Sequence, residues 1–334
     1  MPNPSPQRFL ETVNAYQKTA AIKAAVELNV FGAIAAGARL PPAIAAYCQA
    51  AERGIRILCD HLAIIGILAK EGQAYRLTPD TAMFLVPSSH AYMGRVLEFM
   101  LSPSLVDGFT QLTDAVRRGG TALSPAGTME DEHPVWEKFA RAMVPIMQVP
   151  ATLAADLLTV PAHGDVRVLD VAAGHGIFGI ALAKKYANIE LVSQDWGNVV
   201  VVARENALKM GLAGRHKTLP GDVFEIDWDG RYDVIFLANF LHHFDEPTCI
   251  SLLTKARSAL NEGGSVAIVE FVPNEDRLSP PSTAAFALVM LATTANGDAY
   301  RFSDFDRMCK AAGLTNNTMT ALWPSAETLL IAKA

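Results

Sequence analysis

A glycine-rich turn at residues 172–179 is the first stretch whose residue types could bind a ligand. Gly174, Gly176 and Gly179 follow the spacing G-x-G-x-x-G, between an apolar run typical of a strand and a run typical of a helix. Glycines here let the backbone approach a ligand closely, and the helix start offers free N–H groups and partial positive charge. The turn predicts a site for an anionic group, and a phosphate and a carboxylate fit it equally well. His175, inside the turn, is expected to face solvent.

Three acidic residues restrict the kind of ligand. Asp170 lies four residues before Gly174, where a carboxylate would repel a pyrophosphate but could accept hydrogen bonds from an ammonium group. Asp195 ends the next apolar run, 21 residues after Gly174, where a carboxylate can accept hydrogen bonds from both ribose hydroxyls. Asp222 follows the third run and can bind the amino group of an adenine.

Together these acids describe a ligand with an ammonium group, a ribose and an adenine but no phosphate. S-adenosylmethionine has these groups, and we expect it to be the cofactor. The other predicted cofactor contacts lie at or beside the ends of the same apolar runs: Trp196, Val223, Phe224 and Asn239.

Two adjacent histidines supply the candidate base. His242 and His243 follow the fourth run, in the segment ANFLHHFDEP at residues 238–247. A methyl group on a sulfonium is already activated, so an enzyme needs mainly to align it and to remove a proton from the acceptor. An imidazole can take that proton from a phenol near neutral pH. Adjacent side chains on a helix diverge by about 100°, so we predict no metal site here.

The ordered motifs of residues 169–273 resemble the S-adenosylmethionine-dependent small-molecule O-methyltransferases of the caffeic acid and acetylserotonin type. The segments that carry the resemblance are LDVAAGHGIFGIALAKKY, IELVSQDW, PGDVFE, ANFLHHFDEP and SVAIVEFVP. It covers nearly the whole chain, because this family also has an N-terminal winged-helix dimerisation domain. The resemblance implies a homodimer and a small aromatic, phenolic or polyketide-like methyl acceptor, with no nucleic-acid or membrane partner.

The resemblance also implies catalytic roles. His242 matches the general base of the family, and Glu270, which ends the fifth run, matches an acid that orients this histidine. Two positions depart from the family pattern: His243 replaces an aspartate, and Ala299 replaces a second orienting acid. The neighbouring Asp298 is a candidate substitute for that acid.

Apolar side chains in two helical segments are expected to line the acceptor pocket. One segment has a stripe at helical spacing that includes Trp136 and Phe139, which suits either the core or the cover of an apolar pocket. The predicted pocket residues are Met143, Met147, Phe286 and Met290.

The hydrophobic pattern of the sequence changes along the chain. After residue 165, short β-rich runs alternate with helix-length stretches, which predicts an α/β fold with an open, mostly parallel, Rossmann-like sheet. Residues 302–313 predict a last helix, and residues 314–334 an antiparallel strand pair at the sheet edge. The parallel runs are 166–171, 189–195, 216–222, 232–240 and 265–272.

The N-terminal part predicts a helical winged-helix domain for dimerisation. Residues 70–78 favour a hairpin, and the preceding helix has one apolar stripe made of Ile55, Leu58, Leu62 and Ile65. We therefore expect a dimerisation domain at 1–100, a helical linker that covers the acceptor at 101–160, and a catalytic domain at 161–334.

Charge and cysteine usage exclude several classes of protein. The 334 residues have a net charge of −6, and residues 1–100 contain nine Lys or Arg against seven Asp or Glu, too few for a DNA-binding footprint. The four cysteines form no Cys-x-x-Cys pair, which argues against a disulfide framework and a zinc ribbon. The start of the chain lacks the apolar core of a signal peptide, and we expect a cytoplasmic location.

Three alternatives stay open at this level. The same cofactor could serve methyl transfer to carbon or nitrogen, or chemistry without methyl transfer. A winged-helix regulator that senses S-adenosylmethionine belongs to another class, and the weakly basic N-terminal part counts against it. A nicotinamide oxidoreductase is the third alternative, and Asp170 and Asp222 argue against it.

Overall fold

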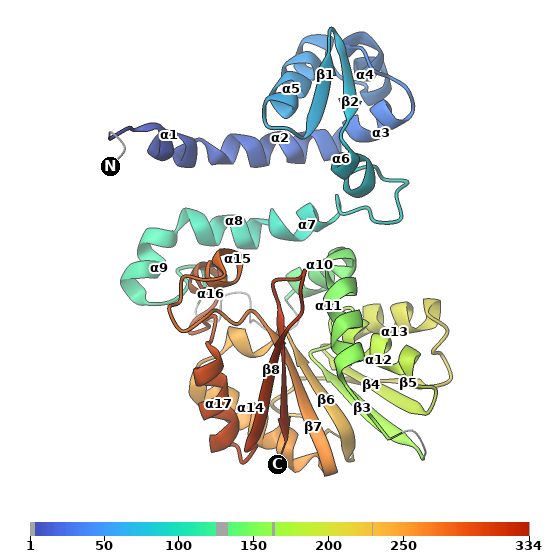
Figure 1. Ribbon diagram of the computed structural model, residues 1–334, viewed down its shortest axis with the longest axis vertical. Coiled ribbons are helices and arrows are strands. Elements are labelled where there is room, and N and C mark those ends of the chain that lie inside the picture. Colours follow the sequence, from blue (N-terminus) through green and yellow to red (C-terminus); the bar gives the residue numbers. More distant parts are fainter. Residues whose placement is uncertain (1–3, 125–132, 162–163, 229, 334) are drawn as a thin grey trace. The chain divides into compact units, whose positions relative to one another are not determined.

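The computed structural model describes residues 4–124, 133–161, 164–228 and 230–333. The chain divides into two compact units, Met1–Leu97 and Glu98–Ala334 (Figure 1). The assignment of residues 101–160 to a separate acceptor-covering region stays a prediction.

The first unit is a helical domain with a small hairpin. Its elements are α1 (Gln7–Val13), α2 (Ala15–Glu27), α3 (Val30–Ala35), α4 (Pro41–Cys48), α5 (Glu52–Ile64), β1 (Leu68–Glu71), β2 (Ala74–Leu77) and α6 (Pro79–Phe84). Strands β1 and β2 pair antiparallel, as the predicted wing requires. Ile55 and Leu62 are buried in the core of this unit, and Leu58 and Ile65 pack against it, which confirms the apolar stripe of α5.

Helices precede the sheet of the second unit. They are α7 (Val96–Met100), which spans the unit boundary, α8 (Pro103–Thr110), α9 (Leu112–Arg118), α10 (Val135–Ala142) and α11 (Val144–Leu157). Trp136 and Phe139 of α10 lie one helical turn apart, so both rings are on one side of the helix.

A seven-stranded sheet forms the centre of the second unit, in the order β5-β4-β3-β6-β7-β9-β8. Pairing is parallel from β5 to β7, and β9 pairs antiparallel with both β7 and β8, which confirms the predicted sheet and its edge. The strands are β3 (Val166–Val171), β4 (Ile189–Asp195), β5 (His216–Pro220), β6 (Tyr232–Ala238), β7 (Leu260–Glu270), β8 (Asn316–Ala321) and β9 (Thr328–Lys333).

Helices cover both faces of this sheet (Figure 1). One face carries α12 (Ile177–Lys185) and α13 (Val200–Lys209), and the other α14 (Glu246–Ser258) and α17 (Phe302–Ala311). Between β7 and α17 lie two short helices, α15 (Pro281–Ala284) and α16 (Phe286–Thr293). Because both faces are covered, the central strands are almost continuously apolar. Leu252 of α14 and Phe305 of α17 pack with Ile235 of β6 in one buried core.

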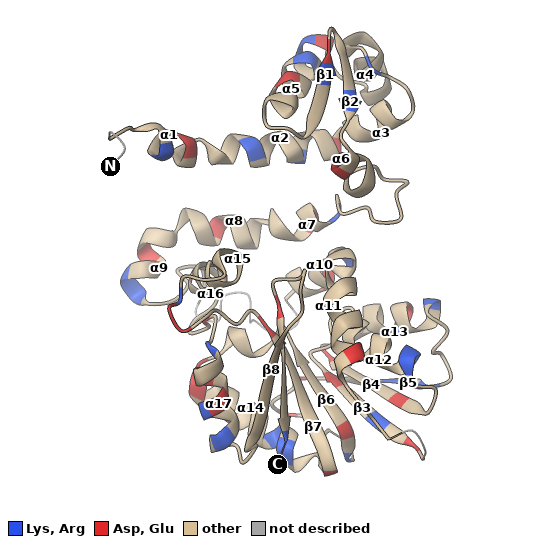
Figure 2. Cartoon of the chain, viewed as in Figure 1, with Lys and Arg blue, Asp and Glu red and all other residues tan. Residues whose placement is uncertain are grey.

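Charged residues of both signs are interspersed along the elements of each unit (Figure 2). Among the described residues, no helix is both long and apolar enough to cross a membrane.

Candidate active site

The candidate site lies at the carboxyl ends of the central strands. The chain order reverses between β3 and β6, which are adjacent in the sheet but separated by β4 and β5 in sequence. Open α/β sheets bind ligands at such a reversal, because the loops from neighbouring strands leave in opposite directions.

Two adjoining hollows occupy this position. We call the first the loop hollow; it is lined by Trp136, Phe139, Ala172, Ala173, Gly174, His175, Phe178, Asp195, Trp196, Val199, Ala238, Asn239, Phe240 and His243. We call the second the strand hollow; it is lined by Ala172, Gln194, Asp195, Trp196, Gly221, Asp222, Val223, Phe224, Phe240 and Phe244. The two share Ala172, Asp195, Trp196 and Phe240, so one elongated ligand can occupy both.

Asp195 stands where the two hollows meet. Its Oδ2 accepts a hydrogen bond from the Gly174 N–H at 2.7 Å, and its Oδ1 accepts one from the Trp196 N–H at 2.7 Å. Burial raises the pKa of this carboxyl to about 6, and the two N–H donors oppose the shift. Each carboxylate oxygen has a second lone pair, so Asp195 can accept further hydrogen bonds from a ligand.

Asp170, Gly176 and Gly179 lie behind the glycine loop and line neither hollow. Asp170 is 1 % exposed and accepts a hydrogen bond from the Gly179 N–H at 3.0 Å. A Cβ on Gly179 would lie 2.5 Å from Leu191 Cδ1, and one on Gly176, where φ is +72°, 2.9 Å from the Ala203 Cβ. The two glycines are thus needed for close packing of the loop against β4 and α13. The predicted contact of these three residues with the cofactor stays a prediction.

The turn after β5 forms the outer wall of the strand hollow. Asp222 accepts a hydrogen bond from the Phe224 N–H at 2.9 Å, and Val223 is buried between them. Lys255 of α14 stabilises the turn, since its Nζ donates hydrogen bonds to the carbonyls of Val223 at 2.8 Å and Ile226 at 2.6 Å. Sequence reasoning missed this lysine because it lies on another element.

Two residues with left-handed backbone lie at the reversal. Ala172 has φ 49° and Asn239 has φ 52°, and both line the loop hollow. Such a conformation is unfavourable for residues other than glycine and often marks a functional site. The Ala172 N–H donates to the Gln194 side chain at 3.2 Å, and the Asn239 N–H donates to the Val269 carbonyl at 2.7 Å.

His242 and Glu270 form a buried pair beside the loop hollow. His242 Nδ1 and Glu270 Oε2 are 2.5 Å apart, and the two residues are 4 % and 0 % exposed. Glu270 Oε1 accepts hydrogen bonds from the N–H groups of Phe240 at 3.0 Å and His242 at 3.3 Å. Glu270 thus contacts three groups of the turn after β6, namely the His242 ring and two backbone N–H groups. In the neutral tautomer with its proton on Nδ1, His242 has a lone pair on Nε2.

His243 and His175 contribute rings to the loop hollow itself. The His243 ring lies edge-on to Trp136, with centroids 5.1 Å apart, and the His175 ring stacks on Phe139 at 5.8 Å. Burial lowers the pKa of both imidazoles, that of His175 to about 4. His175 is 3 % exposed, so the expectation that it faces solvent is wrong. The sequence feature that could have indicated these ring contacts is the apolar stripe with Trp136 and Phe139 on one side of α10, because these two rings contact His243 and His175.

The four predicted acceptor residues lie outside the two hollows. Phe286 is half-buried, with its ring edge-on to His242 at 4.8 Å and stacked on Phe271 at 4.1 Å. Met147 Sδ lies 3.5 Å from the Asn239 amide nitrogen. Met143 and Met290 are buried, 5 % and 3 % exposed. Phe286 and Met147 therefore contact site residues, and their role toward an acceptor stays a prediction.

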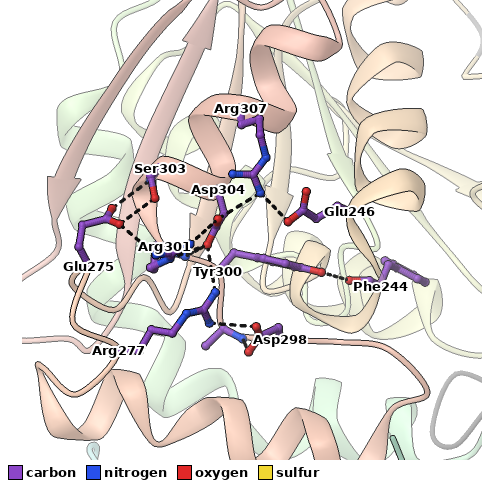
Figure 3. Close-up of polar contacts among 11 residues, drawn as sticks. Phe244, Glu246, Glu275, Arg277, Asp298, Tyr300, Arg301, Ser303, Asp304 and Arg307 are labelled. Carbon is purple, nitrogen blue, oxygen red and sulfur yellow. Dashed lines mark hydrogen bonds and ion pairs between the residues drawn. The ribbon is translucent and has the colours of Figure 1, made fainter. Parts of the chain in front are cut away.

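The predicted substitute acid Asp298 does not turn toward His242. Its carboxylate pairs with Arg277 at 3.0 Å and accepts a hydrogen bond from the Ala299 N–H (Figure 3). Its backbone N–H, by contrast, donates to the His242 carbonyl at 3.0 Å. Asp298 thus supports the backbone of the histidine turn rather than its imidazole, because Arg277 competes for the carboxylate.

Asp304 at the start of α17 holds this region together (Figure 3). Its side chain is 2 % exposed and pairs with Arg301 at 2.9 Å, Arg307 at 3.1 Å and Arg277 at 3.3 Å. The hydrogen bonds from Arg301 and Arg307 outweigh the effect of burial and lower the pKa of Asp304 to about 2. The network ties the 298–304 segment to α14 through the ion pair of Arg307 with Glu246.

Comparison with known proteins gives a consistent assignment. Residues 109–315 match a model of the O-methyltransferase domain, and residues 10–87 match a model of the O-methyltransferase dimerisation domain. The chain is 27 % identical over 292 residues to the 3-hydroxy-5-methyl-1-naphthoate 3-O-methyltransferase of Streptomyces sahachiroi, covering 86 % of this chain and 84 % of the relative.

Two solved structures share the fold over essentially the full length. A candidate O-methyltransferase from Nostoc punctiforme is 48 % identical, with a TM-score of 0.95 and 100 % of both chains covered. Human N-acetylserotonin methyltransferase, solved in complex with S-adenosylmethionine, is 21 % identical, with a TM-score of 0.86 and 99 % and 98 % of the chains covered.

We expect Asp304→Asn to lower the free energy of unfolding by about 2 to 4 kcal/mol at pH 7, because three arginines lose their shared buried carboxylate. Asp114→Asn, which removes an exposed ion pair with Arg117, should change it by less than about 1 kcal/mol. Chemical denaturation of both variants measures the difference. The Asp304 contribution should be complete above about pH 4 and disappear as the pH falls toward 2, because the folded pKa is depressed. An equal, small loss in both variants would contradict this role.

Proposed function

The chain belongs to the O-methyltransferase family, and on this premise we propose that it transfers the methyl group of S-adenosylmethionine to a hydroxyl of a small aromatic acceptor, with His242 as the general base. The observation that carries the proposal is the buried pair of His242 Nδ1 and Glu270 Oε2, 2.5 Å apart, beside a two-part hollow at the carboxyl ends of the strands.

The pair prepares His242 for proton abstraction. The carboxylate of Glu270 holds the Nδ1 proton, which fixes the tautomer and leaves the Nε2 lone pair to take a proton from the acceptor hydroxyl. The imidazolium that results is stabilised by the same carboxylate. The two backbone N–H groups on Glu270 Oε1 keep the carboxylate in place during this change.

The two hollows fit the chemical groups of the cofactor. Asp195 lines both hollows and can accept hydrogen bonds from the ribose hydroxyls. In the strand hollow, Asp222, with Val223 and Phe224 beside it, can accept a hydrogen bond from the adenine amino group. Trp196 lines both hollows, so its ring can contact the adenosine. When bound, S-adenosylmethionine supplies a methyl group activated by its sulfonium.

The methionyl part of the cofactor would then lie in the loop hollow. Unsatisfied polar atoms are buried there, among them Asn239 Oδ1, His175 Nε2 and His243 Nδ1. A buried polar atom without a hydrogen bond is unfavourable, so these atoms indicate a polar ligand.

The aromatic side chains beside His242 favour a flat, aromatic acceptor. Phe286 and Phe271 stack on each other, and Phe286 places its ring edge against His242. An aromatic acceptor could join this stack while its hydroxyl reaches the imidazole. The relative from Streptomyces sahachiroi acts on a hydroxynaphthoate, a compound of this kind.

We further propose that the protein acts as a cytoplasmic homodimer. Helices α1 and α2 of the first unit expose the apolar side chains of Phe9, Leu10, Val13 and Tyr16. A contiguous exposed apolar surface commonly serves association, and residues 10–87 match a dimerisation domain. All four cysteines are free thiols, which suits a reducing compartment.

We expect His242→Ala to lower turnover of a phenolic acceptor by about 100-fold or more, because the hydroxyl loses its base. Its affinity for adenosylhomocysteine should stay within a few fold of wild type. Glu270→Gln should lower turnover by about tenfold or more. A panel of phenols and hydroxylated aromatic acids, assayed for methyl transfer by mass spectrometry, measures both effects.

The control for these variants is His90→Ala, which changes an exposed histidine of the first unit and should leave turnover unchanged. Unaltered turnover in His242→Ala would exclude His242 as the base. Methyl transfer only to carbon or nitrogen acceptors would contradict the proposed reaction.

We expect the affinity for adenosylhomocysteine to fall about tenfold between pH 7 and pH 5. The ribose hydroxyls need Asp195 as a carboxylate, and its pKa of about 6 means that it gains a proton over this range. Calorimetry at a series of pH values measures the dependence. In Asp195→Asn the affinity should be lower at pH 7 and nearly independent of pH; a pH dependence that persists in this variant would assign the titration to another group.

A further inference from the structure

His175 lines the loop hollow, and its imidazole has a buried hydrogen-bond donor without a partner among the described residues. Its Nδ1 accepts a hydrogen bond from the Ile177 N–H at 3.2 Å. A nitrogen that accepts from an N–H carries no proton, so the single proton of the neutral ring lies on Nε2. Nε2 is buried and has no hydrogen-bond partner among the described residues, and the residue as a whole is 3 % exposed.

The position of His175 links this donor to the start of α12. Helix N-termini attract anions through their free N–H groups and their partial positive charge. In α12 two of these donors are already engaged, since Ile177 donates to His175 Nδ1 and Gly179 donates to Asp170. The Nε2–H of His175 therefore adds one hydrogen-bond donor near the helix start, on a residue that lines the loop hollow. Stacking on Phe139, with an angle of 26° between the rings, fixes the ring plane.

A neutral ring suits this role over the physiological pH range. Burial lowers the pKa of His175 to about 4, so the ring keeps one proton and one lone pair near pH 7. The Nδ1 lone pair accepts a hydrogen bond from the Ile177 N–H, and the Nε2–H donor of the same ring has no partner among the described residues.

The proposed orientation of the cofactor decides which group meets this donor. With the adenine at Asp222 and the ribose at Asp195, the amino-acid end lies toward His175, Asn239 and His243. Of the two charged groups at that end, the ammonium is itself a donor and cannot accept from Nε2–H. The carboxylate can, and among the described residues that line the loop hollow none is a lysine or an arginine. A carboxylate bound here must therefore be recognised by neutral donors.

We propose that His175 donates its Nε2–H to the methionyl carboxylate of S-adenosylmethionine and so selects adenosyl ligands that carry this carboxylate. The inference rests on the proposed function, because it takes the cofactor and its orientation from there.

The test compares two ligands and two variants by calorimetry. The ligands are adenosylhomocysteine and its decarboxylated analogue, in which a hydrogen replaces the carboxylate. His175→Asn keeps an oxygen that can accept from the Ile177 N–H, as in an Asx turn, but has no group at the position of Nε2. His175→Gln places an amide N–H near the position of Nε2 but gives up the acceptor for Ile177.

Wild type should prefer adenosylhomocysteine over the analogue by about tenfold or more, the range of a hydrogen bond to a charged group. In His175→Asn this preference should fall by about tenfold through weaker binding of adenosylhomocysteine alone. His175→Gln should keep more of the preference than His175→Asn. If His175 only shapes the turn, the two variants should behave in the reverse order. His175→Asn should then bind like wild type, and His175→Gln should bind both ligands more weakly to the same extent.

A preference in His175→Asn within about threefold of wild type overturns the inference, and so does an equal loss of both ligands. If wild type binds adenosylhomocysteine, either result leaves the proposed function standing and removes only the role of His175. Wild type that binds neither ligand would instead contradict the proposed function, and the inference with it.

Discussion

The fully buried carboxylate of Glu270 is the constraint on which the candidate site depends. A charge in this position is stable only if donors surround it, and here the donors are the His242 ring and the backbone N–H groups of Phe240 and His242. All three belong to the turn after β6, while Glu270 ends β7, so the arrangement requires these strands to pair in parallel and in register. The same hydrogen bonds also hold the imidazole of His242 in position. The stability of this turn and the proposed role of His242 as the base therefore depend on the same contacts.

The glycine loop stabilises two other buried carboxylates in a similar way, by donating backbone hydrogen bonds to them. Asp170 and Asp195 end neighbouring parallel strands, and burial raises the pKa of both, to about 7 and about 6. The loop supplies one N–H to each, from Gly179 and Gly174. Asp170 is enclosed by this contact, whereas Asp195 remains at the surface of the two hollows. One acid thus holds the loop against the sheet, and the other is left in a position to bind a ligand.

The region around Asp298 shows how a departure from the family pattern is accommodated. Ala299, at the position where the resemblance to the family predicts an acid, is buried, and the carboxylate of the adjacent Asp298 pairs with Arg277, which also contacts Asp304. Support for the histidine turn comes instead from the backbone, through the hydrogen bond from the Asp298 N–H to the His242 carbonyl. His243, in place of an aspartate, adds an aromatic contact with Trp136. The turn is thus held by backbone and aromatic contacts, and Glu270 is the acid on the imidazole of His242.

The strands, their parallel arrangement and the edge of the sheet at which the site forms follow from the amino-acid sequence. Apolar runs of strand length specify buried strands, and parallel strands bring their carboxyl ends to one edge; the positions of Asp195, Asp222, His242 and Glu270 follow from that rule alone. Which side chains at this edge line the two hollows follows only from the folded chain. His175 faces the hollow because Phe139, from a distant helix, stacks on it, and Asp298 faces away because Arg277 reaches it from another loop. A local pattern places a residue at the edge of a sheet, but the direction of its side chain depends on partners that are remote in sequence and meet it only in the folded chain.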